Sequence, residues 1–405
     1  MKVLVITPYF FPYESPRGYR WTQIVNTWIS EGVEVKVVTA HDGIGNSDTD
    51  HIYRSGFSTP DKKWSRDRSP SRSFPGRSIL KKIYRSWMWP DESYSWIKPG
   101  SKMARQLISK FSPDVMITVS WPFSTHLIGY KISKETGLPW LMDIGDPFYY
   151  GNLNSRNNHW LYSRRNALIE VKLLEKCNSI CVTNSNLKQV YKELIHENKI
   201  HVIGPLHSPI KDAITQRSNT GIIRIGYFGS LYTGVRDPGQ VVSFLEKLCK
   251  KFDQKNLELH FFGSFKQEHL SILNNFSSKD AVINIHDRLG RHEVTSSMQK
   301  MDVLLSIGNK NPNQLPSKVV DYVIANRPVL HLSFIKADPV TTFFQGSEAL
   351  FNQDAGSEPG DPLVEFILGH EGRRFDPEYQ RSIMQKSDKT TIAHEYMTVL
   401  RSILE

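Results

Sequence analysis

The stretch IIRIGYFGSLYTGVRDP, residues 222–238, decides the fold class. It begins with the compact apolar run Ile222–Phe228, which predicts a buried β-strand, and it continues into a loop that carries Gly229, Gly234 and Arg236. The next segment, Gly239–Lys250, has the apolar spacing of an amphipathic helix. A strand, a glycine-bearing loop and a helix in this order form the unit from which parallel α/β sheets are built.

Apolar runs of this kind alternate with helical patterns along most of the chain. In the first half, the predicted strands are Lys2–Thr7, Val33–Thr39, Asp114–Ser120, Trp140–Ile144, Ser179–Thr183 and His201–Ile203. In the second half they are Ile222–Phe228, Leu257–Phe262, Val282–His286, Val303–Ile307 and Val329–Leu332. The predicted helices include Arg20–Ser30, Pro99–Lys110, Ser124–Thr136, Asn166–Lys176, Gly239–Lys250 and Ser317–Ile324. This alternation favours βαβ crossovers and parallel sheets.

Two such series predict an α/β protein with two Rossmann-like, doubly wound domains that face each other across a cleft. The polar stretch Ser208–Thr220 is the expected linker, so the domains are expected at residues 1–207 and 208–385. A final helical segment, residues 386–405, can cross back to the first domain. Because ligands of open parallel sheets bind beyond the carboxyl ends of the strands, each domain is expected to hold one ligand. Such an arrangement suits a two-substrate transferase.

The composition excludes several other classes of protein. With 39% hydrophobic residues the chain can build sizeable cores, which excludes a wholly disordered protein. No apolar run approaches the ~18 residues that a membrane-spanning helix needs, and the apolar run at the start is too short for a signal peptide. The three cysteines cannot build a disulfide framework, so a reducing cytoplasm fits best.

The net charge of +10 is confined to the first half of the chain. Residues 1–205 hold 28 basic and 18 acidic side chains, whereas residues 206–405 hold 23 of each. The densest stretch, Lys62–Arg85, has nine Lys and Arg side chains interleaved with aromatic residues. This segment can dock on an anionic membrane surface, and a solvated loop whose charge aids solubility is equally consistent with it. Nucleic acid is not an expected partner, because no zinc-finger spacing or RNP-like strand accompanies the charge.

The loop after the first strand carries Gly18 shortly before the expected helix. Free N–H groups and the helix dipole at such a position favour an anionic ligand, although the glycine alone is more consistent with an ordinary loop. The GxGxxG pattern of dinucleotide-binding proteins is absent.

The loop after Phe228 is a plausible site for a diphosphate. Gly229 lets the backbone approach a ligand closely, and Arg236 can direct a fork of N–H donors at phosphate oxygens. A polar loop in which Arg236 pairs with Asp237 explains the same residues equally well.

A third segment, residues 309–329, follows a predicted strand. Pro316 and Ser317 have the pattern of a helix start, with Pro316 at the first helical position. Asp321 lies one turn further, where its carboxylate can accept two hydrogen bonds from a ribose diol. It can also act only by complementing the helix dipole.

These segments together resemble the GT-B fold retaining glycosyltransferases of family 4, in the bacterial polysaccharide-biosynthesis branch. The resemblance covers nearly the whole chain and is carried by PDVMITVSWPFSTHLIGYKISKETGLPWLMDIGDPF (Pro113–Phe148), YFGSLYTGVRDP (Tyr227–Pro238) and LPSKVVDYVIANRPV (Leu315–Val329). It implies an enzyme of the hexosyltransferase type that uses a nucleotide diphosphate sugar as co-substrate, retains the anomeric configuration and needs no metal or other cofactor.

The resemblance also implies the site residues. The nucleotide-sugar site is expected to comprise Gly18, Gly229, Ser230, Arg236, Asn313, Leu315, Pro316, Ser317, Lys318 and Asp321. The catalytic candidates are Asp146, Arg236 and Lys318, and the acceptor-side candidates are Arg20 and His126. Asp146 is equally consistent with a turn role in its Asp-Pro pair.

Three positions depart from the family's pattern. Asn313 stands for the first acid of its E-x7-E motif, of which Asp321 is the second. Ser230 stands where many members have arginine, and Gly145 stands where they often have histidine or arginine.

The expected acceptor is a saccharide or a lipid-linked saccharide in cell-surface polysaccharide biosynthesis. The protein would then be cytoplasmic and peripheral at the inner membrane face. The alternatives are a catalytically inactive transferase-like scaffold and a GT-B sugar-nucleotide 2-epimerase. A nucleic-acid-binding module is the weakest alternative.

Overall fold

The structure, a computed structural model, describes residues 1–13, 15–40, 50–55, 87–151, 159–210, 221–252, 257–278 and 281–405. The chain divides into two compact units. Unit 1 consists of Met1–Gly204 together with Lys389–Glu405, and unit 2 is Pro205–Asp388. The predicted basic segment Lys62–Arg85 lies outside the described residues.

Unit 1 is built on a parallel sheet in the order β3-β2-β1-β4-β5-β6-β7. Its strands are β1 (Lys2–Ile6), β2 (Glu34–Thr39), β3 (Ile52–Arg54), β4 (Val115–Val119), β5 (Trp140–Ile144), β6 (Ser179–Val182) and β7 (Ile200–Val202). Its α-helices are α1 (Pro16–Ser30), α4 (Ile97–Phe111), α5 (Ser124–Thr136), α6 (His159–Lys176), α7 (Ser185–Tyr191) and α15 (Lys389–Leu404). All residues of β4 and β5 are buried. Strands in the middle of a parallel sheet have this pattern because helices cover both faces of the sheet.

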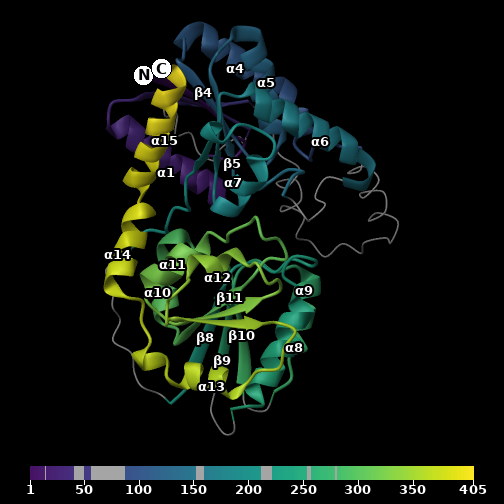
Figure 1. Ribbon diagram of the computed structural model, residues 1–405, viewed down its shortest axis with the longest axis vertical. Helices are drawn as coiled ribbons and strands as arrows, with labels where there is room; N and C mark the ends of the chain where they lie inside the picture. Colours follow the sequence, from purple (N-terminus) through teal and green to yellow (C-terminus); the bar gives the residue numbers. More distant parts are fainter. Residues whose placement is uncertain are drawn as a thin grey trace. The chain divides into compact units, whose positions relative to one another are not determined.

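The C-terminal helix α15 belongs to unit 1, where it lies alongside α1 (Figure 1). Trp28 donates from Nε1 to the carbonyl of Ala393 at 2.9 Å, and the rings of Trp21 and Tyr396 lie 5.0 Å apart. These contacts join the first helix of the chain to the last one.

Unit 2 is built on a second parallel sheet, in the order β10-β9-β8-β11-β12-β13. Its strands are β8 (Ile223–Phe228), β9 (Leu257–Phe262), β10 (Ala281–His286), β11 (Val303–Ile307), β12 (Val329–Ser333) and β13 (Leu350–Asp354). Its α-helices are α8 (Pro238–Cys249), α9 (Gln267–Asn274), α10 (Arg291–Gln299), α11 (Lys318–Ala325), α12 (Pro339–Phe343), α13 (Asp361–Leu368) and α14 (Pro377–Lys386). The described elements thus confirm the predicted fold class of two parallel-sheet α/β units.

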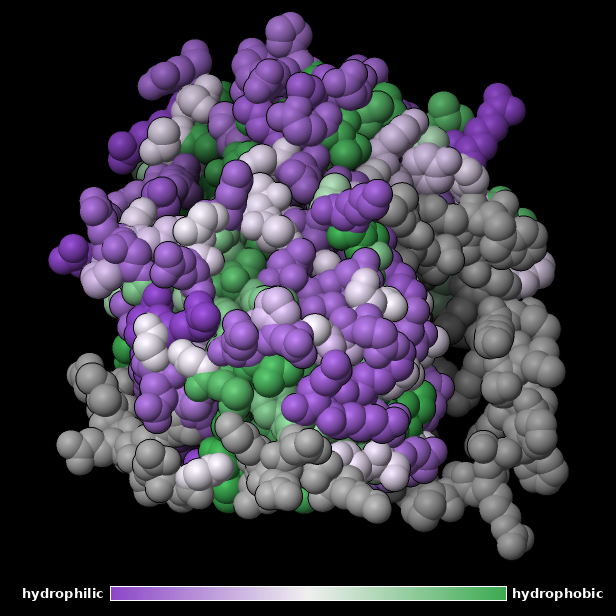
Figure 2. Space-filling model, turned by 60° about the horizontal axis from the view of Figure 1, so that its bottom comes forward, coloured by the Kyte–Doolittle hydropathy of each residue, from purple (hydrophilic) through white to green (hydrophobic). Residues whose placement is uncertain are grey.

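On the face that Figure 2 presents, the described residues are mainly hydrophilic, and hydrophobic residues lie between them in small groups. Isolated exposed apolar side chains of unit 2 include Val282, which is 60% exposed. Such isolated positions are ordinary in folded proteins.

Several helix starts differ from the sequence prediction, and the largest difference is at α6, which begins at His159 rather than Asn166. Helix α1 begins at Pro16 rather than Arg20, because Ser15 caps it by accepting a hydrogen bond from Gly18 N at 2.9 Å. Gly18 therefore lies in the first turn of the helix, where a Cβ would come within 2.6 Å of the Tyr13 carbonyl oxygen. Helix α11 begins at Lys318, so the expectation that Pro316 would be its first residue was wrong.

Candidate functional site

The strand order of unit 2 places a topological switch point between β8 and β11. The chain leaves β8 toward β9 on one side and leaves β11 toward β12 on the other, so the loops after these two strands diverge. Lys310 N donates to the carbonyl of Val235 at 3.2 Å, which joins the two loops. A crevice between such loops is where open α/β sheets hold their ligands.

Arg236 lies in the first of these loops, after a tight turn. Arg236 N donates to the carbonyl of Tyr232 at 2.8 Å, and Gly234 in the turn has a φ of +85°, which favours glycine. The Arg236 guanidinium donates from Nε to Asn309 Oδ1 at 2.9 Å and from Nη1 to the hydroxyl of Tyr227 at 3.5 Å. Both partners are neutral, and no carboxylate pairs with this side chain among the residues that the structure describes.

The neighbouring Asp237 caps helix α8 and does not form the ion pair with Arg236 that the sequence left open. Its Oδ1 accepts hydrogen bonds from Gly239 N at 2.9 Å and Gln240 N at 3.3 Å, which caps helix α8. The Arg236 charge is therefore not neutralised by its sequence neighbour.

Gly229 lies in closely packed surroundings at the end of β8. A Cβ at this position would lie 2.8 Å from the Tyr227 hydroxyl, and the Gly229 carbonyl oxygen approaches Gly263 too closely for a side chain there. The Ser230 carbonyl accepts from the same Tyr227 hydroxyl at 2.9 Å, and the Ser230 side chain is half-buried. Tyr227 thus holds both residue 230 and Arg236.

The second loop, after β11, is held in shape by hydrogen bonds between its own asparagine side chains and its backbone. Asn309 donates from Nδ2 to the carbonyl of Gln314 at 3.3 Å, and Asn311 Oδ1 accepts from Asn313 N at 2.9 Å. Asn313, Leu315 and Pro316 are half-buried, and Ser317 is exposed at the start of α11. These predicted site residues therefore lie in the loop that Arg236 contacts through Asn309.

Asp321 has other partners than the predicted ribose. Its carboxylate is 2% exposed and accepts from Ser208 N at 2.7 Å, from Ser208 Oγ at 3.2 Å and from Lys318 Nζ at 3.0 Å. In this arrangement Asp321 holds the segment that opens unit 2, and Lys318 is paired with Asp321 rather than directed at a ligand. A ribose or a phosphate would have to exchange with these contacts.

In unit 1 the loop that follows β5 contains Gly145 and the catalytic candidate Asp146, which is half-buried. The same loop is fixed by Glu170, whose Oε2 accepts from Tyr149 N at 2.9 Å and from Tyr150 N at 2.8 Å. Burial raises the pKa of Glu170 to about 7. The position of the residues after β5 is thus coupled to a carboxyl group that titrates near neutral pH.

Sequence reasoning missed Arg17, which the structure brings to this loop. Arg17 Nη1 donates to Asp143 Oδ2 at 3.2 Å, and its guanidinium covers the Cα of Gly145, where any side chain would overlap it. Arg17 Nη2 is buried and has no hydrogen-bond partner in the described part of the chain. The signal for it in the sequence is an arginine directly before Gly18.

The two predicted acceptor-side residues lie inside unit 1. Arg20 is 5% exposed and donates to the carbonyls of Gly204 at 2.6 Å and Ile203 at 3.3 Å, and to the hydroxyl of Tyr396 at 3.2 Å. His126 is 1% exposed, and its Nδ1 lies 2.7 Å from Thr118 Oγ1. Burial lowers the pKa of His126 to about 3, so its ring is neutral. In this structure both side chains are buried and have hydrogen-bond partners within unit 1.

No group of three or more His, Cys, Asp or Glu side chains is arranged to hold a metal ion within the described ranges. Among the described helices, none is both long and apolar enough to cross a bilayer.

Comparison with known proteins identifies the fold. No family model matches the chain, and no curated protein does. The sucrose-phosphate synthase from Thermosynechococcus elongatus matches with a TM-score of 0.66 at 12% identity, over 99% of this chain and 98% of that one. The lipopolysaccharide outer core galactosyltransferase WaaB matches with a TM-score of 0.58 at 12% identity, over 99% of each chain. The E. coli trehalose-6-phosphate structure bound with UDP-2-fluoro glucose matches with a TM-score of 0.63 at 10% identity, over 100% of this chain and 99% of that one.

A putative UDP-N-acetylglucosamine 2-epimerase from Listeria monocytogenes also matches, with a TM-score of 0.54 at 10% identity, over 99% of this chain and 96% of that one. At these identities the likeness concerns the fold alone. The chain has the two-unit, parallel-sheet fold of the GT-B glycosyltransferase structures.

Proposed function

We propose that this protein is a glycosyltransferase that takes a sugar from a nucleotide diphosphate sugar and transfers it to a saccharide. Unit 2 would bind the donor, and unit 1 would present the acceptor. The sequence resemblance supports assignment to the retaining enzymes of family 4. The fold supports a sugar-nucleotide enzyme in general, because WaaB, a neighbour of the same fold, is described as a galactosyltransferase and another neighbour is bound with UDP-2-fluoro glucose.

The observation that carries this proposal is the position of Arg236. Its guanidinium stands at the switch point of the unit 2 sheet, has only neutral partners among the described residues and lies between two loops that start at the carboxyl ends of β8 and β11. A cation in that position fits a diphosphate, which an arginine fork binds through charge-assisted hydrogen bonds.

The chemistry requires stabilisation of the leaving diphosphate, which gains negative charge as the glycosidic bond breaks. Arg236 would supply one cation, and the Lys318 ammonium would supply a second if it exchanged its contact with Asp321 for a phosphate oxygen. In a reaction with retention, the leaving phosphate oxygen can accept the proton of the attacking hydroxyl on the same face of the sugar. The chain then needs no metal ion, and Asp146 in unit 1 is the candidate for contact with the reacting groups.

The acceptor we propose is a lipid-linked saccharide in cell-surface polysaccharide biosynthesis, at the cytoplasmic face of the membrane. This proposal is supported by the charge of the first half of the chain, +10 over residues 1–205, which suits an anionic surface. It is also supported by the sequence resemblance.

Calorimetry with UDP and GDP tests the donor site. We expect Arg236→Ala to weaken binding of the nucleotide by roughly 10- to 100-fold, because a hydrogen bond to a charged group is worth about 1.5–3 kcal/mol. The matched control is Arg374→Ala, which removes an exposed arginine of unit 2 whose hydrogen-bond partners, in the part of the chain that the structure describes, are the backbone carbonyls of His370 and Arg373. Unchanged affinity of Arg236→Ala would contradict the proposed site.

A panel of UDP-, GDP- and dTDP-sugars separates the alternatives. Nucleotide release that depends on an acceptor supports transfer, whereas interconversion of sugars without release supports a 2-epimerase. Failure to bind any nucleotide supports an inactive scaffold, which the amide at Asn313 and the missing side chain at Gly145 would fit.

A further inference from the structure

Helix α6 has an inner face that is firmly held in unit 1. Glu170 accepts from Tyr149 N, Tyr150 N and the Tyr191 hydroxyl, and Leu173 and Leu174 lie in the hydrophobic core. These contacts anchor the second half of α6 in unit 1.

The outer face of α6 combines exposed leucines with cations. Leu161 is 49% exposed and Leu168 is 63% exposed, two turns apart on the helix. Arg164 and Arg165 lie between them, and Lys172 follows one turn after Leu168; all three are exposed. The only acidic residue between Leu161 and Lys172 is the buried Glu170.

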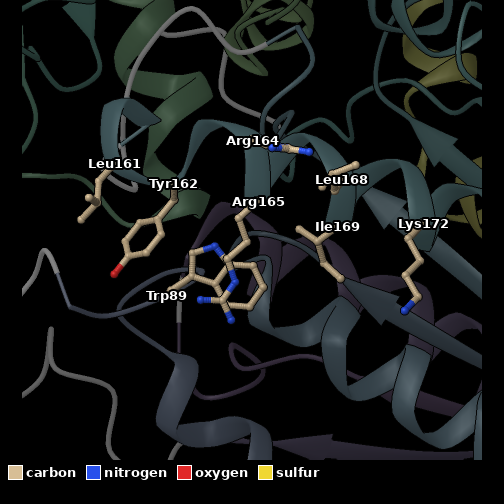
Figure 3. Close-up of a pocket in the computed structure, with 8 residues that line it drawn as sticks. All are labelled: Trp89, Leu161, Tyr162, Arg164, Arg165, Leu168, Ile169 and Lys172. Carbon is tan, nitrogen blue, oxygen red and sulfur yellow. The ribbon is translucent and has the colours of Figure 1, made fainter.

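A hollow of about 620 Å³ lies against this face, and Figure 3 shows the side chains that line it. Trp89 forms one wall. Its Nε1 donates to Asn166 Oδ1 at 2.8 Å, and the Arg165 guanidinium lies 3.5 Å from the centre of a Trp89 ring. Trp87, two residues earlier, is 79% exposed. The face thus has tryptophan, leucine and arginine in one continuous region.

This combination is typical of helices that lie at a membrane–water interface. Leucine and tryptophan enter the boundary between headgroups and acyl chains, while arginine and lysine reach the lipid phosphates. The sign of the charge favours an anionic partner. The chain's own segment Lys62–Arg85 carries nine cations, so like charge opposes its use as a cover for this face.

We propose that the outer face of α6, with Trp89, docks on the surface of an anionic phospholipid bilayer. Leu161 and Leu168 enter the headgroup layer, and Arg164 and Lys172 contact lipid phosphates. This surface is a different one from the predicted Lys62–Arg85 segment, and its use requires neither a sugar nucleotide nor catalysis.

Vesicle flotation tests the proposal on the full-length protein. The probes are vesicles of phosphatidylcholine alone and of phosphatidylcholine mixed with phosphatidylglycerol. We expect binding to the mixed vesicles, weaker binding to the neutral ones, and about a tenfold loss of binding to the mixed vesicles for the double variant Leu161→Glu/Leu168→Glu. We expect Arg164→Glu to lower the binding as well and to reduce its dependence on salt.

The control is Val282→Glu, which places one carboxylate at a 60% exposed apolar position of unit 2, and it is compared with Leu168→Glu alone, which adds the same single charge; Val282→Glu should bind like the wild type. Thermal melts should be unchanged for all the variants, because the replaced side chains are exposed. A separate variant in which the cations of Lys62–Arg85 are neutralised measures the contribution of that segment.

Three results would overturn the proposal. One is equal binding of the α6 double variant and the wild type, whatever the basic segment contributes. Another is equal binding of the wild type to neutral and anionic vesicles. The third is a wild-type dimer, detected by light scattering, that the double variant no longer forms although it still binds vesicles. This result would identify the outer face of α6 as a contact between two copies of the chain. None of these results depends on whether the protein transfers a sugar.

Discussion

The guanidinium of Arg17 lies where a side chain at residue 145 would have to be. Arg17 comes from the start of α1 and pairs with Asp143, and a Cβ on Gly145 would overlap its Nη2, Cζ and Nε atoms. Glycine at 145 is therefore what makes room for this ion pair. A guanidinium from α1 thus occupies the space next to position 145, where members of the family named in the sequence resemblance often have a histidine or arginine side chain.

This relationship predicts the effect of Gly145→Ala. The methyl group should displace Arg17 from the buried carboxylate of Asp143 and lower the free energy of unfolding by about 1–3 kcal/mol, measured by urea denaturation. Gly204→Ala is the control, because a Cβ at Gly204 would meet nothing within 4 Å. In an Arg17→Ala background, Gly145→Ala should be nearly neutral. Equal effects of Gly145→Ala and Gly204→Ala would contradict the steric argument.

Glu170 predicts a pH dependence of stability. Burial raises the folded-state pKa of Glu170 to about 7 from its ordinary value of 4.5, so between these pH values the folded state holds the proton more tightly than the unfolded state. The contribution of Glu170 to stability is therefore fully present below about pH 4.5, falls as the pH rises and levels off above pH 7. Each pKa unit corresponds to about 1.36 kcal/mol, so the free energy of unfolding should fall by about 3 kcal/mol in total between pH 4.5 and pH 7.

Glu170→Gln should remove this dependence. Urea denaturation at several pH values from 4.5 to 8 should show the variant gaining stability relative to the wild type as the pH rises. Parallel profiles of the two proteins would mean that Glu170 does not titrate in this range.

Asp321 offers a test between its observed partners and its predicted ligand. Because both carboxylate oxygens are engaged by Ser208 and Lys318, Asp321→Asn should lower the free energy of unfolding by about 1–3 kcal/mol. It should also change the affinities for UDP and for 2′-deoxy-UDP by the same factor, measured by calorimetry. A loss for UDP that exceeds the loss for the deoxy nucleotide by tenfold or more would instead support the ribose role.

Tyr396 connects α15 to two buried charged groups of unit 1. Its hydroxyl donates to Asp143 Oδ1 at 2.7 Å and accepts from Arg20 Nη2 at 3.2 Å. Tyr396→Phe leaves both groups short of a partner and should lower the free energy of unfolding by about 1–3 kcal/mol in urea. Tyr94→Phe, at a 42% exposed tyrosine of the same unit, should have no measurable effect. A similar loss for both variants would argue against the role of the buried hydroxyl.

The strands were the most predictable part of the structure, because buried parallel strands are compact apolar runs. All the strands predicted from such runs are present, with ends that agree to within one residue. Strands β3 and β13 were not predicted. The sequence of β13, LFNQD, has no fully buried residue, and β3 spans only Ile52–Arg54, so neither has the apolar signal of an interior strand.

The candidate site was predictable only in part. Arg236 could be selected because its loop and its charge are local features of the sequence. The partners of Asp321 and Arg20 could not, because Ser208 is 113 residues from Asp321 and Tyr396 is 376 residues from Arg20. A carboxylate or a guanidinium in a sequence looks the same whether it meets a ligand or a distant part of its own chain.

The discontinuous composition of unit 1 has a consequence for biosynthesis. Its last element, α15, is translated after all of unit 2, so a ribosome completes Pro205–Asp388 before unit 1 has its full set of residues. Until then the indole of Trp28 lacks the Ala393 carbonyl, and Asp143 lacks the Tyr396 hydroxyl. A fragment that stops at Gly204 would lack these contacts permanently. Such a fragment would need α15, added as a separate peptide, to complete unit 1.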